Sequence, residues 1–303
     1  MIVRPRPHWL RLLFVRRGSL VRHILSQQLF TVLLACAVVG SHGWLFHFKV
    51  TLSPSPFSLM GVSLAIFLGF RINASYDRYW EARKLWGAVL VEARNLGRQA
   101  LTLTTTGTEV RPFVRGLAGF AASMRNQLRQ QAATTGLNGL LPPALIARLD
   151  GARFPASAVA LWLGQELRRF RDEGALDPIA LTSMDGALSQ MTAALGGCER
   201  IANTPLPFTY SVILHRSTYL YCWLLPFGLV DSIGLLTPLV VAFVSYTFFA
   251  LEALSDEVEE PFGTMPNDLA LDAIVAAVHA SLCELLGEVP PPPPQPDHQF
   301  QLT

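Results

Sequence analysis

The distribution of charged residues constrains this chain more than any other feature. No Asp or Glu occurs before Asp77, and between Arg216 and Glu252 the only charged residue is Asp231. Charged residues make up 15% of the whole chain, against about 25% in an average soluble domain. Long apolar stretches without charge are typical of segments that cross a lipid bilayer. The sequence therefore predicts a multi-pass membrane protein.

Four apolar segments are candidate membrane spans. They are Ile24–Phe46, Phe57–Phe70, Ser217–Val230 and Ile233–Leu251. Asp231 and the Ser-Ile-Gly sequence that follows it indicate a tight turn between the last two spans. An acid at the centre of a bilayer costs roughly 2.5–3.5 kcal/mol on insertion scales. We therefore expect Asp231 to lie in a turn outside the membrane.

Basic residues precede the first span and indicate how the chain is oriented. They are Arg4, Arg6, Arg11, Arg16, Arg17 and Arg22, with no acid among them. A basic arm that binds nucleic acid is the competing interpretation, but these arginines directly adjoin a span and the net charge is only +2. Lys and Arg accumulate on the cytoplasmic side of membranes. We therefore expect both termini in the cytoplasm and no nucleic-acid partner.

The second segment is too short to cross the bilayer as a helix by itself. Phe57–Phe70 has 14 residues, which rise about 21 Å, whereas the hydrocarbon core is about 30 Å thick. Arg71–Arg98 contains no proline, and its apolar and charged residues interleave at helical spacing. These features predict one long helix that enters the membrane near Phe57 and continues into the cytoplasm. We expect such a helix to sit inside a protein assembly.

The predicted fold class is an all-α membrane protein, because no strand alternation is sustained. Six parts are expected: a basic N-terminal segment (1–23), the first two spans with the cytoplasmic extension of the second (24–98), a cytoplasmic helical region (99–210), the last two spans (211–254), a C-terminal helical region (255–289) and a Pro-rich tail (290–303). The cytoplasmic region is predicted to hold helices at Glu109–Gln131, Ala144–Leu149, Pro155–Phe170 and Pro178–Asn203. The tail reads as an extended polyproline spacer.

One face of the second span is the candidate functional surface. Val62, Ile66 and Phe70 are spaced by four residues and share a helix face, which Asn73 and Asp77 continue. Such a stripe either packs against neighbouring helices or lines a pore, where rings of apolar side chains form a constriction that can gate by dewetting. Four spans are few for enclosing a pore. The pore interpretation therefore requires a cyclic homo-oligomer with this helix at its axis.

Three separated motifs carry a resemblance to a known family. They are Ile66–Arg71 with Asn73, Ser75, Tyr76, Arg78, Tyr79, Trp80 and Glu81–Gly87; Gly197–Pro205 with Pro207, Phe208, Tyr210, His215 and Arg216; and Glu260–Gly263. In this order they resemble the bestrophin family, and its bacterial branch in particular. The resemblance covers nearly the whole chain.

The resemblance implies a homopentamer with one central pore and four spans per subunit, in the inner membrane of a bacterium. The apolar neck of the family's pore matches Val62, Ile66 and Phe70, and its cytoplasmic aperture is best matched by Ile179. Asn73 and Asp77 become candidate vestibule residues. Eukaryotic members pass chloride and other small anions. The implied function is therefore an ion channel for small monovalent ions, with cation selectivity an alternative in this branch.

We expect no metal and no cofactor. Eukaryotic members bind calcium through a run of acids after the Pro-Phe-Gly element, but here Thr264–Asp268 holds one carboxylate, and Ca²⁺ requires six to eight oxygens. Five acids before that stretch are interpreted as the solvated exit of the fourth span: Glu252, Asp256, Glu257, Glu259 and Glu260. Arg125 and Arg129 share a helix face and are read either as cations of a vestibule or as solvated surface residues.

Two other function classes remain as alternatives. One is a membrane-anchored enzyme whose active site lies in residues 100–205, and the other is a structural or signalling membrane protein without ion flux. The cytoplasmic region shows no nucleophile elbow, P-loop or HExxH motif. The sequence therefore favours a protein that is not an enzyme.

Overall fold

The structure is a computed structural model, and it describes residues 1–303 except 5–7, 9, 11–19, 46–47, 50–51 and 299. Four of the predicted anchoring arginines and the predicted end of the first span at Phe46 lie outside the described residues. The chain forms two compact units. The span unit comprises 6–79 and 205–260, and the terminal unit comprises 1–5, 80–204 and 261–303.

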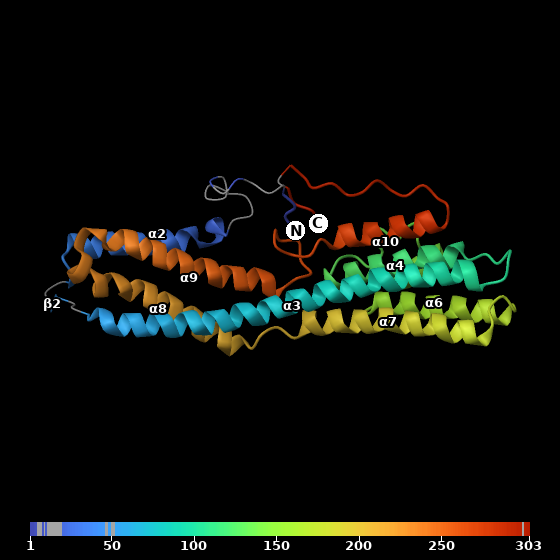
Figure 1. Cartoon of the computed structure of the whole chain (residues 1–303), viewed down its shortest axis with the longest axis horizontal. Coiled ribbons are helices and arrows are strands. Elements are labelled where there is room, and N and C mark those ends of the chain that lie inside the picture. Colours follow the sequence, from blue (N-terminus) through green and yellow to red (C-terminus); the bar gives the residue numbers. More distant parts are fainter. Residues whose placement is uncertain (5–7, 9, 11–19, 46–47, 50–51, 299) are drawn as a thin grey trace. The chain divides into compact units, whose positions relative to one another are not determined.

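Four helices build the described part of the span unit. They are α2 (Val21–Gly40), the first half of α3 (Pro54–Leu103), α8 (Phe208–Ile233) and α9 (Thr237–Glu259). Helix α2 packs against both α8 and α9, and α8 packs against α9 (Figure 1). Between α2 and α3, the two-residue strands β1 (Trp44–Leu45) and β2 (Phe48–Lys49) form a short antiparallel pair. Apart from this pair, the fold is helical, as predicted.

In the described part of the chain, three helical stretches are long and apolar enough to cross a membrane. They are Val21–Gly40, Ser55–Leu103 and Phe208–Glu259. The last stretch contains α8, the 3₁₀ turn η1 (Gly234–Leu236) and α9. The predicted turn at Asp231 is displaced, because α8 continues through Ile233 and the chain reverses at Gly234, whose φ of +54° favours glycine. Asp231 therefore lies in the last turn of α8.

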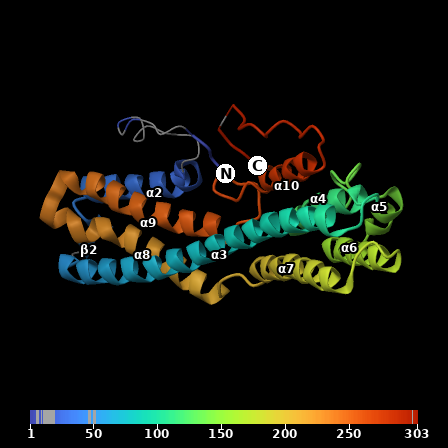
Figure 2. The same cartoon turned by 45° about the vertical axis from the view of Figure 1, so that its right-hand side comes forward.

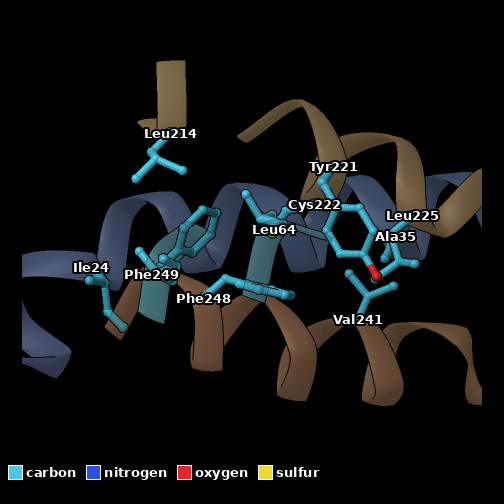
Figure 3. Close-up of a cluster of buried hydrophobic side chains, with 11 residues drawn as sticks. Ile24, Ala35, Leu64, Leu214, Tyr221, Cys222, Leu225, Val241, Phe248 and Phe249 are labelled. Atoms are coloured by element: carbon cyan, nitrogen blue, oxygen red, sulfur yellow. The ribbon is translucent and has the colours of Figure 1, made fainter. Parts of the chain in front are cut away.

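The core of the span unit fixes how α3 is rotated. Leu64 and Leu68, one turn apart on α3, are buried among residues of the other three helices. Figure 3 shows Leu64 with its neighbours, and the partners of the cluster are Ile24, Ala35, Leu214, Tyr221, Cys222, Leu225, Val241, Phe248 and Phe249. A Cβ added to Gly61 would lie 2.7 Å from the hydroxyl of Tyr221. Helices α3 and α8 therefore approach closely at this point.

The terminal unit is a bundle of six helical segments. They are the second half of α3, α4 (Arg111–Leu128), α5 (Pro143–Leu149), α6 (Pro155–Asp172), α7 (Pro178–Asn203) and α10 (Leu271–Leu285). Helix α4 packs against α6 and α10, α6 packs against α7, and α5 contacts α6 (Figure 2). Its largest fully buried side chains include Trp86, Phe113, Phe120 and Phe170.

The C-terminal tail ends in contact with the N-terminus, within the terminal unit (Figure 1). Ile2 and Gln301 form an antiparallel bridge, and the Val3 backbone N–H donates to the Phe300 carbonyl at 2.9 Å. The Gln301 side chain donates to the Thr264 carbonyl at 2.7 Å. The residues that follow the predicted polyproline spacer are therefore anchored to the terminal unit.

Candidate pore-lining face

The three predicted neck residues lie on one uncovered face of α3. Val62, Ile66 and Phe70 are 60%, 52% and 61% exposed. Leu64 and Leu68 lie on the opposite side of the helix and face the core. An apolar face this exposed is not packed against the other described helices of its own chain. It must contact lipid, a second protein surface, or the lumen of a pore.

Asn73 and Asp77 continue the same face. Both side chains are exposed, and both lie in the span unit. The helix does not break between Phe70 and Asp77, so the apolar stretch passes directly into a polar one. The structure thus brings together on one side of α3 five of the six residues that the sequence singled out.

Arg71 anchors the opposite side of α3. Its side chain is only 4% exposed although it directly follows Phe70. It forms ion pairs with Asp256 at 2.5 Å and with Glu259 at 3.7 Å, both on α9. One turn further along α3, the hydroxyls of Ser75 and Ser255 lie 2.9 Å apart. These contacts hold α3 against α9 and leave the Phe70 side outward.

Most of the acids at the end of α9 are paired rather than simply solvated. Besides Asp256 and Glu259, Glu252 lies 2.7 Å from His215, and Glu257 lies 3.3 Å from His23. The interpretation as a solvated exit is therefore wrong for Glu252, Glu257 and Glu259, whose side chains are at most 13% exposed, whereas Asp256 is paired but 60% exposed. Sequence reasoning missed the pairing because the partners are on other helices. His215 lies 37 residues from Glu252 in the chain, and Arg71 lies 185 residues from Asp256.

Ile179, the predicted residue of the second constriction, belongs to the terminal unit. It is 84% exposed. Helix α7 begins at Pro178, and the Asp177 carboxylate caps it by accepting from the backbone N–H groups of Ile179 at 2.8 Å and Ala180 at 3.1 Å. A proline in the first turn and an aspartate at the cap are favoured at helix starts. This capped turn presents Ile179 to solvent.

Arg125 and Arg129 are neither vestibule cations nor solvated surface residues. Arg125 Nη1 lies 2.8 Å from Asp272 Oδ1, and Arg129 Nη1 lies 2.7 Å from Asp272 Oδ2. Arg129 also donates to the Phe262 carbonyl at 3.2 Å. Burial alone would raise the pKa of Asp272, but the hydrogen bond from Arg129 and the two guanidinium charges hold that pKa below its ordinary value. The pair of arginines joins α4 to α10.

The stretch after the Pro-Phe-Gly element is a tight turn. Asp268 is buried, and its Oδ2 accepts from the Met265 backbone N–H at 2.7 Å. The Leu269 backbone N–H donates to the Pro261 carbonyl at 2.9 Å, which closes the loop. Among the described residues, no group of three or more His, Cys, Asp and Glu side chains could hold a metal ion.

Comparison with known proteins places these features in a family. The family described as "Bacterial/Fungal Bestrophin protein" matches residues 1–284. A voltage-dependent anion channel-forming protein of Ralstonia nicotianae is 45% identical over 291 residues, which is 95% of each chain. The voltage-dependent anion channel-forming protein YneE of Escherichia coli is 42% identical over 304 residues and covers both chains completely.

Solved structures agree with the sequence comparison. A crystal structure of a bacterial bestrophin homologue from Klebsiella pneumoniae superposes with a TM-score of 0.84 at 39% sequence identity. The match covers 88% of this chain and 100% of that one. The similarity therefore extends to the three-dimensional arrangement of the helices.

Proposed function

The chain belongs to the bacterial and fungal bestrophin family of membrane proteins, and from that premise we propose that it is an ion channel whose pore is lined by the exposed face of α3. The ions are small and monovalent, and anions are preferred. This preference rests on the relatives, which are named as voltage-dependent anion channel-forming proteins.

The proposed assembly is a homopentamer. One chain presents a single uncovered pore face and cannot enclose a lumen, so copies related by a cyclic axis must complete it. In this arrangement each subunit crosses the bacterial inner membrane four times, through α2, α3, α8 and α9. Both termini lie in the cytoplasm, and the pore face of α3 is innermost in the ring.

The proposed neck consists of three stacked rings contributed by Val62, Ile66 and Phe70. Apolar rings offer no ligands to replace the hydration shell of an ion, so a narrow neck of this kind resists conduction by dewetting. Its width then controls the current. Asn73 and Asp77 follow the neck as residues of a vestibule, and a ring of Ile179 side chains forms the second constriction, at the cytoplasmic aperture.

The exposure of Val62, Ile66 and Phe70 carries this proposal. Leu64, Leu68 and Arg71 fix the opposite side of α3, so the helix presents a continuous apolar face. Relatives of this chain are named as channel-forming proteins. The same face continues at Asn73 and Asp77 with polar side chains that suit an aqueous space. A wet vestibule beyond an apolar neck explains both halves of the stripe.

Widening the neck is the direct test. We expect Ile66→Ala and Phe70→Ala to raise single-channel current of the purified protein in planar bilayers, because each removes a ring of bulk from the constriction. Leu33→Ala on α2 and Phe243→Ala on α9 are matched controls, since both residues are exposed apolar side chains of other helices. Unchanged current in both α3 variants would contradict the assignment of the pore face.

The assembly has a separate test. We expect the protein extracted in mild detergent to have a mass five times that of one chain, measured by native mass spectrometry or by light scattering corrected for detergent. A stable monomer would exclude a pore on a shared axis. A ring of another size would retain the pore face but change the number of subunits.

A further inference from the structure

The outer face of α3 within the terminal unit is basic. Lys84, Val91 and Arg98 follow one another at intervals of seven residues, and all three side chains are exposed. Seven residues make almost two full helical turns, so these positions share one side of the helix with a small drift. Counting back along the unbroken helix by the same interval leads to Asp77 and then to Phe70.

The charge on this part of α3 is unbalanced. Residues 82–103 contain the cations Arg83, Lys84, Arg94 and Arg98 but one acid, Glu92. Glu92 accepts from the Asn95 side chain at 3.2 Å and lies next to Val91 rather than on the stripe. Arg83 stacks on the Trp80 ring, with its guanidinium carbon 4.7 Å from the ring centroid.

Lys84 and Arg98 differ from the cations that are held in ion pairs. Arg71, Arg125, Arg129, Arg169 and Arg200 all pair with carboxylates. Within the described part of the chain, neither Lys84 nor Arg98 has such a partner. The charges of Lys84 and Arg98 are best compensated where water and mobile anions supply the counter-charge.

We propose that Lys84 and Arg98 set the preference of the channel for anions, as rings of positive charge in an aqueous vestibule that is lined by α3. This inference rests on the proposed channel function and adds the residues that determine selectivity. The apolar neck carries no formal charge, so any formal charge that acts on a passing ion lies elsewhere along its path. Asp77 would disfavour anions, so the sign of selectivity must come from charges elsewhere along the ion path.

The physical basis is the concentration of counter-ions. A cavity lined by one sign of charge raises the local concentration of small ions of the opposite sign by about tenfold or more. A cyclic assembly repeats both cations in every subunit. Because the Debye length is about 8 Å at 0.15 M ionic strength, the rings act most strongly in dilute salt. Anion preference produced in this way therefore weakens as the salt concentration rises.

Charge reversal tests this inference. We expect the double variant Lys84→Glu/Arg98→Glu to conduct, but with its reversal potential in a KCl gradient shifted from the chloride toward the potassium equilibrium potential. The chloride-to-potassium permeability ratio should fall by about tenfold or more. Arg148→Glu is the matched control, because Arg148 is an exposed cation on α5, and it should leave the reversal potential unchanged.

A second variant and the wild type separate the outcomes. Lys84→Gln/Arg98→Gln should give an intermediate shift, and it remains informative if the double glutamate variant does not assemble. If the wild type passes chloride and the glutamine variant has the same reversal potential as the wild type, this inference alone is overturned. A wild type that assembles but conducts no ions would overturn the proposed channel function and this inference with it.

Discussion

The carboxylate of Asp272 carries much of the connection between α4 and α10. Its two oxygens each accept one guanidinium, from Arg125 and from Arg129. Two charge-assisted hydrogen bonds to one carboxylate are stronger than neutral ones. Since the side chain of Arg129 is only 3% exposed, protonation of Asp272 would leave the charge of that guanidinium without compensation. The stability of the terminal unit is therefore expected to fall at low pH.

We expect the terminal unit to lose stability as the pH falls below about 4. The pKa of Asp272 is lowered in the folded chain, so the stabilising contribution is complete above the ordinary pKa of about 3.9 and is lost as the pH falls through the lower folded value. The variant Asp272→Asn should melt at a lower temperature at neutral pH and should lose part of this acid dependence. Melting curves between pH 3 and 7 measure both effects.

Equal acid dependence of the melting temperature in Asp272→Asn and wild type would contradict this role. Asp172 provides a control, because its pKa is also lowered, mainly by a hydrogen bond from Arg171, but its side chain is half exposed. Ion pairs on exposed surfaces contribute little to stability. We therefore expect Asp172→Asn to change the melting temperature much less than Asp272→Asn.

Helix α3 is the element on which the proposed function depends, and its rotation is set on the side away from the pore face. The Leu64 and Leu68 contacts are apolar and tolerate some rotation, whereas the ion pairs of Arg71 with Asp256 and Glu259 are directional. The Ser75–Ser255 hydrogen bond adds a second directional contact one turn along. We therefore regard Arg71 as a positioning residue for Phe70.

We expect Arg71→Met to destabilise the span unit by about 1–3 kcal/mol and to make single-channel currents variable, since Phe70 would no longer be held in one orientation. Losing one partner of a buried ion pair costs about 3–5 kcal/mol, but Asp256 is 60% exposed and solvent screens its charge. Arg216→Met on the exposed surface of α8 is the control. Thermal unfolding in detergent and bilayer recordings measure the two effects.

Uniform currents of wild-type size in a destabilised Arg71→Met protein would show that Arg71 supports the fold without positioning the neck. Wild-type values of both stability and current would show that the ion pairs contribute to neither. These two results are distinguishable because the melting temperature and the current are measured on the same preparation.

The sequence predicted α3 and α7 well because their signals are local. The absence of proline after Phe70 predicted a continuous helix, and α3 runs unbroken to Leu103. Pro178 starts α7 at the predicted residue, with Asp177 as its cap. Helix α8 begins at Phe208 rather than Ser217, because hydropathy marks the apolar part of a helix and not its full length.

Pairing between distant residues was beyond sequence reasoning. Spacing by four placed Val62, Ile66 and Phe70 on one face, and that face is exposed, while its role as a pore lining stays a prediction. The roles predicted for Arg125 and Arg129 were wrong because their partner, Asp272, lies 147 and 143 residues away in the chain. No periodic pattern connects such positions, so only the folded arrangement reveals which charges remain unpaired.

In the molecule as a whole, both ends of the chain meet in the terminal unit. The Phe300–Thr303 segment pairs with Met1–Val3 and contacts two further places in the unit. Gln301 donates to the Thr264 carbonyl, and the Thr303 carbonyl accepts from the Ala273 backbone N–H at 3.0 Å. The second contact satisfies a backbone donor in the first turn of α10, which has no side-chain cap. The tail therefore fastens the turn after the Pro-Phe-Gly element to the start of α10.

Removal of the last seven residues should loosen this region. We expect a chain ending at Pro296 to melt at a lower temperature and to be cleaved faster by protease between Thr264 and Asp268. Each lost hydrogen bond contributes about 0.5–1.5 kcal/mol net, and ordering of the tail offsets part of that sum. Pro292→Ala, in the exposed extended stretch, is the control that changes the tail without removing its anchor. Cleavage of this turn at the wild-type rate in the shortened chain would show that the contacts of the tail do not stabilise it.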